Sequence, residues 1–172
     1  MSNSKFKLVV GLGNTGEKYS LNRHNLGFLV LDNFLKNEEF EYNGKNNAYI
    51  LKKDGIIFAK PKSFMNVSGE VVGKLANFYQ IEPSEILVIQ DELDLDFGKI
   101  KVSFGSSDAG HNGIKDITRA LGTKDFYRLR FGIGRPANED MAIDAYVLTN
   151  FLPHEISEIK NFDLSQYLNT HL

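Results

Sequence analysis

The sequence predicts an α/β fold: a single domain with a mixed β-sheet flanked by helices on both faces. Apolar runs alternate along the chain with segments of helical periodicity, a pattern typical of alternating strands and helices. Ile86 to Ile89 is a continuous apolar run, as expected for a central strand buried on both faces. Asp54-Gly55 separates two further apolar runs and indicates a hairpin, so the sheet has antiparallel as well as parallel pairs. A chain of 172 residues has the length of one domain, which we expect to span 1–172.

The N-terminal half supplies two strand-to-helix steps and the hairpin. Phe6 to Gly11 is the first predicted strand, and helical periodicity then runs from about His24 to Lys36. The hairpin arms are 48–53 and 56–60, and Pro61 ends the second arm because proline cannot donate to a sheet. Ser68 to Tyr79 has one apolar face and predicts a helix, which leads into the central strand.

The C-terminal half repeats the alternation with more exposed elements. Lys99 to Phe104 alternates polar with apolar residues and predicts a half-exposed strand. A glycine and serine loop leads to a helix from about Asn112 to Leu121, and 127–133 is a further alternating strand. The short apolar stretch 142–148 is of uncertain type, and Pro153 begins a last short helix.

Bulk composition places the chain among ordinary globular proteins. It is 42% hydrophobic and 24% charged, and it has no cysteine, which excludes a disulfide scaffold, a thiolate nucleophile and cysteine-ligated zinc. The N-terminus lacks the apolar stretch of a signal peptide, and no apolar run approaches the length of a membrane span. We therefore expect a cytoplasmic protein with no membrane partner.

Charge is distributed unevenly along the chain. The formal net charge is −2, yet the segment from Lys99 to Arg130 holds seven cations and three anions. A local cationic face on a nearly neutral protein is compatible with binding phosphate groups, although a solvated face without a partner has the same composition.

The glycine-rich loop after the first strand admits two interpretations. Gly11-Leu-Gly-Asn-Thr-Gly16 matches the dinucleotide fingerprint G-x-G-x-x-G. That fingerprint requires a helix that begins within the glycine run, whereas the predicted helix begins near His24, eight residues after Gly16. Asp32, at the spacing of a ribose-binding acid, falls inside that helix. The loop is therefore more consistent with another kind of site after the strand.

Four predicted loops each follow a strand and each bring polar groups. The first carries Asn14 and His24, the second Asn66, the third Asp91 and the fourth Asn112. Such a set suits water attacking a carbonyl: histidine accepts the proton, a carboxylate fixes the imidazole tautomer, and amides hold the substrate or the oxyanion. Singly, each residue has a structural explanation, since Asn66 and Asn112 could cap helices and Asp91 could serve a turn.

Two other chemistries fit less well. Gly105 to Ala109 is a near miss to the nucleophile elbow G-x-S-x-G, in which Ser107 would be the nucleophile and His154 its base. The acidic residues Asp94 and Asp96 do not have the spacing of a calcium loop. We expect no metal and no other cofactor.

The motifs together resemble one known family. Gly11-Leu-Gly-Asn-Thr-Gly with Tyr19 and Arg23-His24-Asn25-x-Gly27-Phe28 is similar to the first signature of bacterial peptidyl-tRNA hydrolase, and Lys60-Pro with Phe64-Met65-Asn66-x-Ser68-Gly69 is similar to the second. Asp91-Glu-Leu-Asp-Leu, Gly110-His-Asn-Gly-Ile and Phe126-x-Arg-Leu-Arg-x-Gly-Ile-Gly-Arg-Pro136 continue the resemblance in family order over residues 6 to 152.

The resemblance implies a single α/β domain with a twisted mixed sheet, a monomer without cofactor or metal, and cleavage of the ester that joins a peptide to the terminal ribose of tRNA. It implies that His24 activates water and that Asp91 holds and polarises His24. Asn14, Asn66 and Asn112 would line the site, and Tyr19 and Met65 would shape the cleft. Lys101 and Arg130, with Lys99 and Arg128 as further candidates, would contact tRNA phosphates. The alternative is a catalytically idle relative that binds RNA with the same face.

Overall fold

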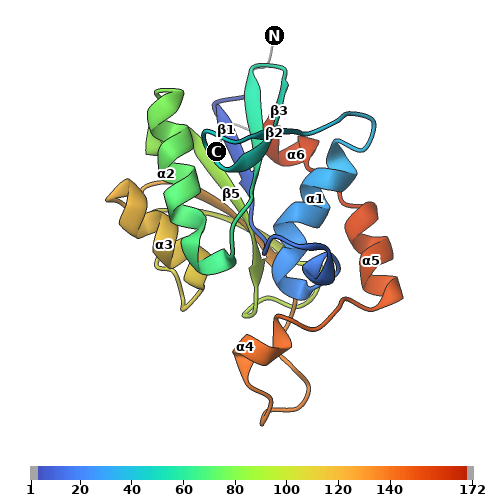
Figure 1. Cartoon of the computed structure of the whole chain (residues 1–172). Coiled ribbons are helices and arrows are strands. Elements are labelled where there is room, and N and C mark those ends of the chain that lie inside the picture. The colour runs from blue at the N-terminus through green and yellow to red at the C-terminus, as the bar shows by residue number, and fades with distance from the viewer. Residues whose placement is uncertain (1–3, 170–172) are drawn as a thin grey trace.

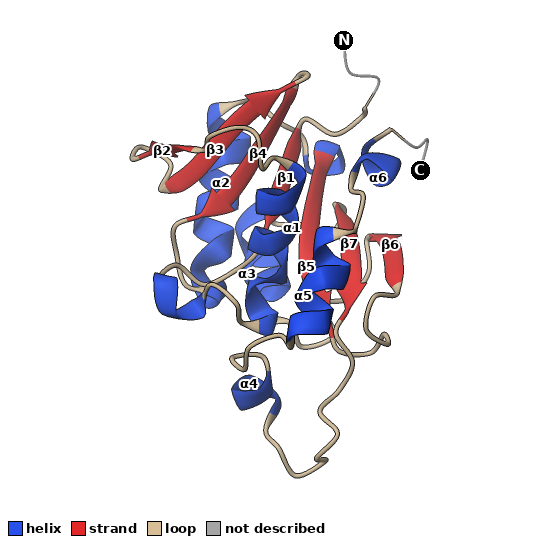
Figure 2. Cartoon of the chain, turned by 90° about the vertical axis from the view of Figure 1, so that its right-hand side faces the viewer, coloured by secondary structure: helices blue, strands red, loops and turns tan. Residues whose placement is uncertain are grey.

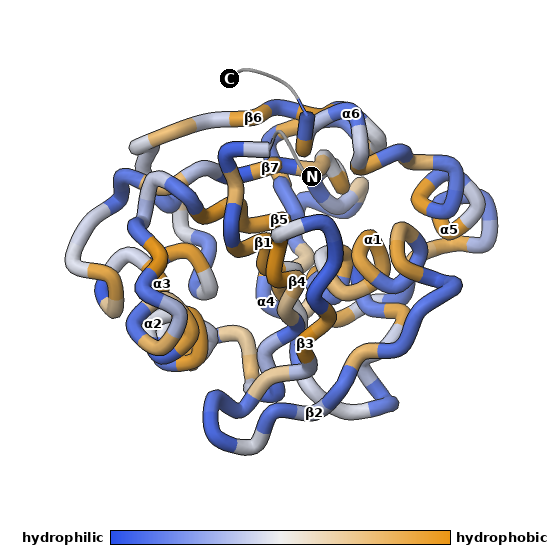
Figure 3. Tube along the Cα trace, turned by 90° about the horizontal axis from the view of Figure 1, so that it is seen from above, coloured by the Kyte–Doolittle hydropathy of each residue, from blue (hydrophilic) through white to orange (hydrophobic). Residues whose placement is uncertain are grey.

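The computed structural model describes residues 4–169, which build one mixed sheet between two layers of helices. Helices α2 and α3 cover one face, and α1 and α5 cover the other (Figures 1 and 3). The predicted α/β class with helices on both faces is therefore confirmed. The predicted domain extent of 1–172 includes residues 1–3 and 170–172, which lie outside the described residues.

The sheet has the strand order β2-β3-β4-β1-β5-β7-β6 (Figure 2). Its four inner strands β4, β1, β5 and β7 are parallel, while β2, β3 and β6 join by antiparallel pairing. The strands are β1 Leu8–Gly11, β2 Glu41–Asn43, β3 Ala48–Lys53, β4 Ile56–Pro61, β5 Ile86–Glu92, β6 Ile100–Phe104 and β7 Tyr127–Gly132.

The helices connect these strands and close the C-terminal part. The α-helices are α1 Leu26–Phe34, α2 Ser68–Phe78, α3 Asn112–Leu121, α4 Ile143–Tyr146, α5 Pro153–Lys160 and α6 Ser165–Leu168. The 3-10 helices are η1 Glu17–Tyr19, η2 Arg23–Asn25, η3 Met65–Val67 and η4 Pro83–Glu85.

Most predicted elements are present, with three differences. The first helix is shorter than predicted, because its first turn is the separate 3-10 helix η2 and α1 ends at Phe34. The uncertain stretch 142–148 contains the single-turn helix α4. The edge strand β2 and the short helix α6 were not predicted, since each is too short to show a period and depends on tertiary contacts.

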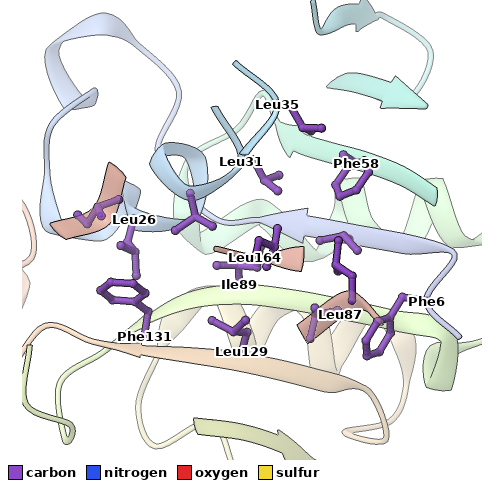
Figure 4. Close-up of a cluster of buried hydrophobic side chains, with 14 of the residues drawn as sticks. Phe6, Leu26, Leu31, Leu35, Phe58, Leu87, Ile89, Leu129, Phe131 and Leu164 are labelled. Carbon is purple, nitrogen blue, oxygen red and sulfur yellow. The ribbon is translucent and has the colours of Figure 1, made fainter. Parts of the chain in front are cut away.

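Two hydrophobic cores lie on opposite faces of the sheet. In β5, Leu87 and Ile89 pack in the core beneath α1 and α5, whereas Ile86 and Val88 pack in the core beneath α2 and α3. Figure 4 shows the first of these cores, where Phe131 and Leu164 join the strand residues. Successive side chains of a strand point to opposite faces, so a strand covered on both sides is apolar throughout, as the sequence predicted.

Glycines bring helix α1 unusually close to β1. A Cβ atom on Gly27 would lie 2.2 Å from the backbone nitrogen of Leu12, and one on Gly11 would lie 2.3 Å from the carbonyl oxygen of Gly27. No other residue type fits at such a distance. Gly11 of the glycine pattern and Gly27 of α1 thus serve helix-to-strand packing, which gives Gly11 a structural role that needs no dinucleotide.

The hairpin has the predicted turn. Asp54 and Gly55 have φ values of 53° and 79°, the left-handed conformations that a two-residue turn between antiparallel strands requires. Among residues 4–169, no helix combines the length and the apolar character of a membrane span.

The parallel strands β4, β1, β5 and β7 end at the same edge of the sheet. The loop after β1, the loop after β4 and the end of β5 meet there, and the loop before α3 reaches the same edge. Ligand sites of α/β sheets form at this edge.

Candidate active site

Asp91 lies near the end of β5 and bridges two histidines. Its Oδ2 is 2.8 Å from Nδ1 of His24, and its Oδ1 is 2.8 Å from Nε2 of His111. The carboxylate is only 3% exposed, so both of its oxygens are satisfied within the protein. An ionised carboxylate only accepts hydrogen bonds, so each ring nitrogen that faces it carries a proton.

Two contacts with the C-terminal part of the chain hold the segment that carries His24. His24 lies in η2, just before α1, and its backbone N–H donates to the carbonyl of Val147 at 2.8 Å. Its neighbour Arg23 donates through Nη1 to Glu155 Oε1 at 2.8 Å in a buried ion pair. With Nδ1–H directed at Asp91, the second nitrogen, Nε2, is left as the acceptor. This arrangement favours the tautomer that the predicted role of His24 as a base requires.

The tautomer of His111 is fixed by the helix that follows it. His111 is the N-cap of α3, and its Nδ1 accepts from the backbone N–H groups of Gly113 and Ile114 at 3.1 and 3.3 Å. A nitrogen that accepts cannot carry the proton, so Nε2 carries it and donates to Asp91. Asp91 thus receives two N–H donors from two different loops.

The electrostatics of the pair favour a charged carboxylate and a basic imidazole. Although burial opposes ionisation, the charges of His24 and His111 and their hydrogen bonds hold the pKa of Asp91 well below its usual range. Burial alone would lower the pKa of His24, but the charge of Asp91 and the hydrogen bond to it raise that pKa above its usual value. His24 is therefore a stronger base than a free imidazole.

These groups open onto a pocket of about 380 Å³. Its lining includes His24, Asp91, His111 and Asn112. Val147 and other residues around α4 also line the pocket, and the Val147 carbonyl accepts from the backbone N–H of His24. A larger hollow of about 620 Å³ lies over β2 and β3 and is lined by three glutamates and no histidine. The first pocket is the candidate active site, because the titratable groups converge there.

Asn14 is held rigidly in the loop after β1 and does not line this pocket. Its backbone N–H donates to Oδ1 of Asn25 at 2.8 Å, and its carbonyl accepts from Nδ2 of Asn25 at 3.0 Å. Its own Oδ1 accepts from the backbone N–H of Met65 at 2.7 Å. Within residues 4–169 the amide nitrogen of Asn14 has no hydrogen-bond partner, so it remains available as a donor. Asn14 lines a neighbouring pocket of about 390 Å³ together with Lys60.

With this geometry established, comparisons with known proteins decide the family. The family model described as peptidyl-tRNA hydrolase matches residues 8–169. The chain belongs to the peptidyl-tRNA hydrolase family. Relatives include the peptidyl-tRNA hydrolase of Mycobacterium marinum, 46% identical over 159 residues that cover 88% of this chain and 82% of the relative. Peptidyl-tRNA hydrolase 1 of Corynebacterium glutamicum is 44% identical over 161 residues, 92% of this chain and 90% of the relative.

Solved structures agree with the sequence comparison. The crystal structure of peptidyl-tRNA hydrolase from Acinetobacter baumannii superimposes with a TM-score of 0.82 at 33% identity, and the match covers 92% of this chain and 83% of that chain. The predictions of the peptidyl-tRNA hydrolase family, of its α/β fold and of a hydrolase are confirmed. The roles of individual residues remain predictions.

The remaining predicted site residues lie at different depths. Asn112 is exposed at the first turn of α3 and lines the pocket, and Asn66 is exposed in η3. Tyr19 is half-buried and stacks edge-to-face on Phe64 with ring centroids 6.2 Å apart. Met65 is 4% exposed and packs against α3, so its side chain lies beneath the site and not along its surface. Met65 does not line the pocket, and its predicted role in shaping the cleft stays a prediction.

Of the four cations predicted to contact tRNA phosphates, two are exposed, one is half-buried and one is buried. Lys99 and Lys101 are exposed at the edge strand β6, and within residues 4–169 neither forms an ion pair. Lys101 pairs across the sheet with Arg130 of β7. Arg130 is half-buried and donates through Nε to Glu92 Oε1 at 2.6 Å.

The prediction for Arg128 is wrong. Its side chain is 1% exposed and donates to Gln90, Ser106 and Ser107, so it cannot reach a phosphate on the protein surface. The alternating pattern does not distinguish Arg128 from Arg130, because both point to the same face of the sheet. Their difference comes from the loop before α3, which covers Arg128 and leaves Arg130 at the edge.

The two rival chemistries find little support in the geometry. Ser107 and His154 are both exposed, and no described hydrogen bond joins Ser107 to a histidine. His24, Asp91 and His111 offer ligand atoms within 4.8 Å of one another, the spacing of a metal site. However, both oxygens of Asp91 accept hydrogen bonds from the two imidazole rings, and Nδ1 of His111 accepts from backbone N–H groups. A cation would have to displace these hydrogen bonds. The donor set favours proton transfer.

Sequence reasoning missed the roles of His111 and Asn25. Both belong to motifs that were recognised, Gly110-His-Asn-Gly and Arg23-His-Asn, but neither was given a function. A signal existed for His111, because histidine is an unusual residue at a helix N-cap and its ring nitrogen must then accept from the backbone. No signal marked Asn25, whose partner lies in the preceding loop.

Proposed function

We propose that the chain hydrolyses the ester between the peptide and the 3′-terminal ribose of peptidyl-tRNA, with His24 as general base on water. The observation that carries the proposal is the 2.8 Å hydrogen bond between His24 Nδ1 and Asp91, which leaves Nε2 free to accept a proton at a pocket. Named relatives of this chain are peptidyl-tRNA hydrolases, which supports the choice of substrate.

The proposed reaction needs one proton shuttle. Water donates a proton to Nε2 of His24 as its oxygen attacks the ester carbonyl, and a tetrahedral oxyanion forms. The imidazolium then returns the proton to the ribose oxygen as the ester bond breaks, releasing the peptide as a carboxylic acid and the tRNA with a free hydroxyl. Asp91 stabilises the imidazolium throughout, as a carboxylate does when it orients a catalytic histidine.

Amide groups suit a substrate whose peptide sequence varies. The free amide nitrogen of Asn14 would donate to a peptide carbonyl, and Asn66 and Asn112 would hold the peptide backbone and the oxyanion. Tyr19 would provide an aromatic wall. Lys99, Lys101 and Arg130 would bind tRNA phosphates at the β6 edge. We further propose that the enzyme acts as a cytoplasmic monomer without a cofactor or metal.

Single-turnover hydrolysis of N-acetyl-aminoacyl-tRNA tests the proposal. The wild-type chain should release N-acetyl-amino acid, and a folded His24→Ala variant should be slower by about 10²–10⁴-fold, the usual contribution of a general base. A matched control is His154→Ala, because His154 is exposed in α5 and outside the pocket. Full activity of the His24→Ala variant would remove the mechanism, and tRNA binding without wild-type turnover would favour the idle relative.

A further inference from the structure

Arg128 of β7 is a buried cation with an unusual set of partners. Its Nε donates to Gln90 Oε1 at 2.6 Å, and its Nη1 donates to Ser106 Oγ at 2.9 Å and to the carbonyl oxygen of Ser107. Within the described residues it forms no ion pair with a carboxylate, and its Nη2 has no hydrogen-bond partner. The residue is 1% exposed.

Burial of such a group is unfavourable, so its presence requires an explanation. A buried arginine without a paired carboxylate keeps its desolvation cost, and an apolar side chain of similar volume is often at least as stable. Burial, together with the nearby charge of Arg130, lowers the pKa of Arg128 to about 10, although the charges of Glu92 and Asp108 act in the opposite direction. Its contribution therefore lies in what its donors hold in place.

One of these partners leads directly to Asp91. Gln90, which accepts from Arg128, donates through Nε2 to the carbonyl oxygen of Asp91 at 3.1 Å. Gln90 is 1% exposed, so the contact has no access to solvent. Arg128 thus fixes the side chain that secures the backbone of the bridging carboxylate.

The other partners lead to His111. The chain from Ser107 to His111 is short and is bonded within itself, since Gly110 N–H donates to Asp108 Oδ1 at 2.8 Å and His111 N–H to the Asp108 carbonyl at 2.9 Å. Ala109 and Gly110 have φ values of 49° and 85°, in the left-handed region. Alanine rarely adopts this conformation, so we infer that the path of the loop imposes it on Ala109. The hydrogen bonds from Arg128 to Ser106 and Ser107 hold the start of this segment in place.

We propose that Arg128 is a positioning residue that holds the two segments supplying Asp91 and His111 in register, and thereby sets the geometry of His24. The inference rests on the proposed function of His24 and Asp91. Arg128 itself contacts neither the substrate nor the reacting atoms. The arginine fork is what the role requires, because two of its nitrogens must donate in different directions at once.

The test uses Arg128→Met, which removes the donors and keeps much of the volume, with Arg119→Met as control. Arg119 is exposed on α3, and among residues 4–169 its one ion pair is with Asp116. Three quantities are measured: kcat and KM for a short N-acetyl-aminoacyl-adenosine and for full N-acetyl-aminoacyl-tRNA, the Tm, and the amide exchange rates of Gly113 and Ile114. Those two amides donate to the ring of His111 and report its position.

We expect Arg128→Met to lower kcat on the short substrate at least tenfold, because small misplacements of catalytic groups have effects of this size. Exchange at Gly113 and Ile114 should quicken at least tenfold, while the Tm changes by no more than about 3 °C. Arg128→Lys should keep the charge yet recover less than half of the lost rate, since one ammonium cannot replace the fork. The Arg119→Met control should match wild type on the short substrate.

Three results would overturn the proposal. The first is an unchanged kcat on the short substrate with a raised KM for tRNA, which would make Arg128 a phosphate contact. The second is full recovery by Arg128→Lys, which would make the charge alone sufficient. The third is unchanged exchange at Gly113 and Ile114. Should Arg128→Met not fold, Arg128→Lys is judged by the same exchange and kcat criteria. A wild-type chain inactive on both substrates would refute the proposed function, while faster exchange in the variant would still support the positioning role.

Discussion

Asp91→Asn tests the centre of the proposed mechanism without changing the size of a side chain. The carboxylate accepts from both His24 and His111, at 2.8 Å each. An amide offers one acceptor and one donor in the same place, so one of the two rings must face the NH₂ group with a lone pair. If that ring is His24, its Nε2 becomes protonated and can no longer accept a proton from water.

The alternative for the variant is a change at His111, and it has its own cost. His111 could face the NH₂ group only if its proton moved from Nε2 to Nδ1. In the wild type, Nδ1 accepts hydrogen bonds from the backbone N–H groups of Gly113 and Ile114, and these bonds would be lost. Loss of an N-cap costs about 1 kcal/mol. The fixed cap of α3 therefore favours the wrong tautomer of His24 over the wrong tautomer of His111.

The size of the effect follows from the lost charge. A carboxylate about 4 Å from an imidazolium stabilises it by roughly 4 kcal/mol at an effective dielectric constant of about 20. With about 1.4 kcal/mol for each factor of ten, kcat should fall by about 10³-fold. The tautomer change acts in the same direction, so the fall should lie near 10³-fold or beyond.

The pH dependence gives a second, independent readout. His24 must be neutral to act as base, and its pKa is raised in the wild type, so kcat should rise with pH through an apparent pKa above the ordinary value of 6.5. Without the charge of Asp91 only burial remains, and burial lowers a histidine pKa. The rising limb of the residual activity should therefore move to lower pH in the variant.

Single-turnover hydrolysis of N-acetyl-aminoacyl-tRNA between pH 5 and 9 measures both effects, with circular dichroism to check the fold. A kcat within threefold of wild type would refute the assigned role of Asp91. If the rising limb of the pH profile of kcat stays in place or moves to higher pH in the variant, the titrating group is not His24.

Three further predictions address other parts of the molecule. Lys101→Ala should raise KM for full-length tRNA and reduce the slope of log KM against log salt by about one, with a short adenosine substrate unaffected; equal losses on both substrates would contradict a phosphate contact. Asn25→Ala should lower kcat about tenfold through Asn14, so adding it to Asn14→Ala should change kcat little further, and additive losses in that double-mutant cycle would show that Asn25 acts elsewhere. Gly27→Ala should lower the free energy of unfolding in denaturant titrations by about 1–3 kcal/mol or more, because its new Cβ would lie 2.2 Å from the backbone nitrogen of Leu12. The control Gly73→Ala, whose Cβ would lie 3.6 Å from its nearest neighbour, should leave the free energy of unfolding unchanged or raise it.

Sequence patterns that are local predicted the fold well. The apolar run at Ile86, the Asp54-Gly55 turn and the amphipathic face of the helix beginning at Ser68 each record a local environment: burial on two faces, a left-handed turn, or one covered face. The strand β2 was not predicted, because three residues are too few to show an alternating pattern. The strand forms through its pairing with β3.

The site was predictable in its residue types but not in its contacts. His24 and Asp91 were chosen because histidine and carboxylate suit water activation, and the resemblance of ordered motifs placed both in a family. Periodicity cannot show that a side chain at position 24 meets one at position 91. The same limit explains Arg128 and Arg130, which are identical in type and in face yet differ in burial.

The sequence by itself determined the family, the α/β class and the identity of the proposed base, because these depend on residue types and on their order along the chain. The tertiary structure alone decided that one carboxylate bridges two imidazoles, that Asn25 immobilises Asn14, and that Arg128 lies beneath the loop before α3. Each of these is a contact between segments distant in sequence, and its free energy depends on distances of a few ångströms that only the packing of helices against the sheet sets.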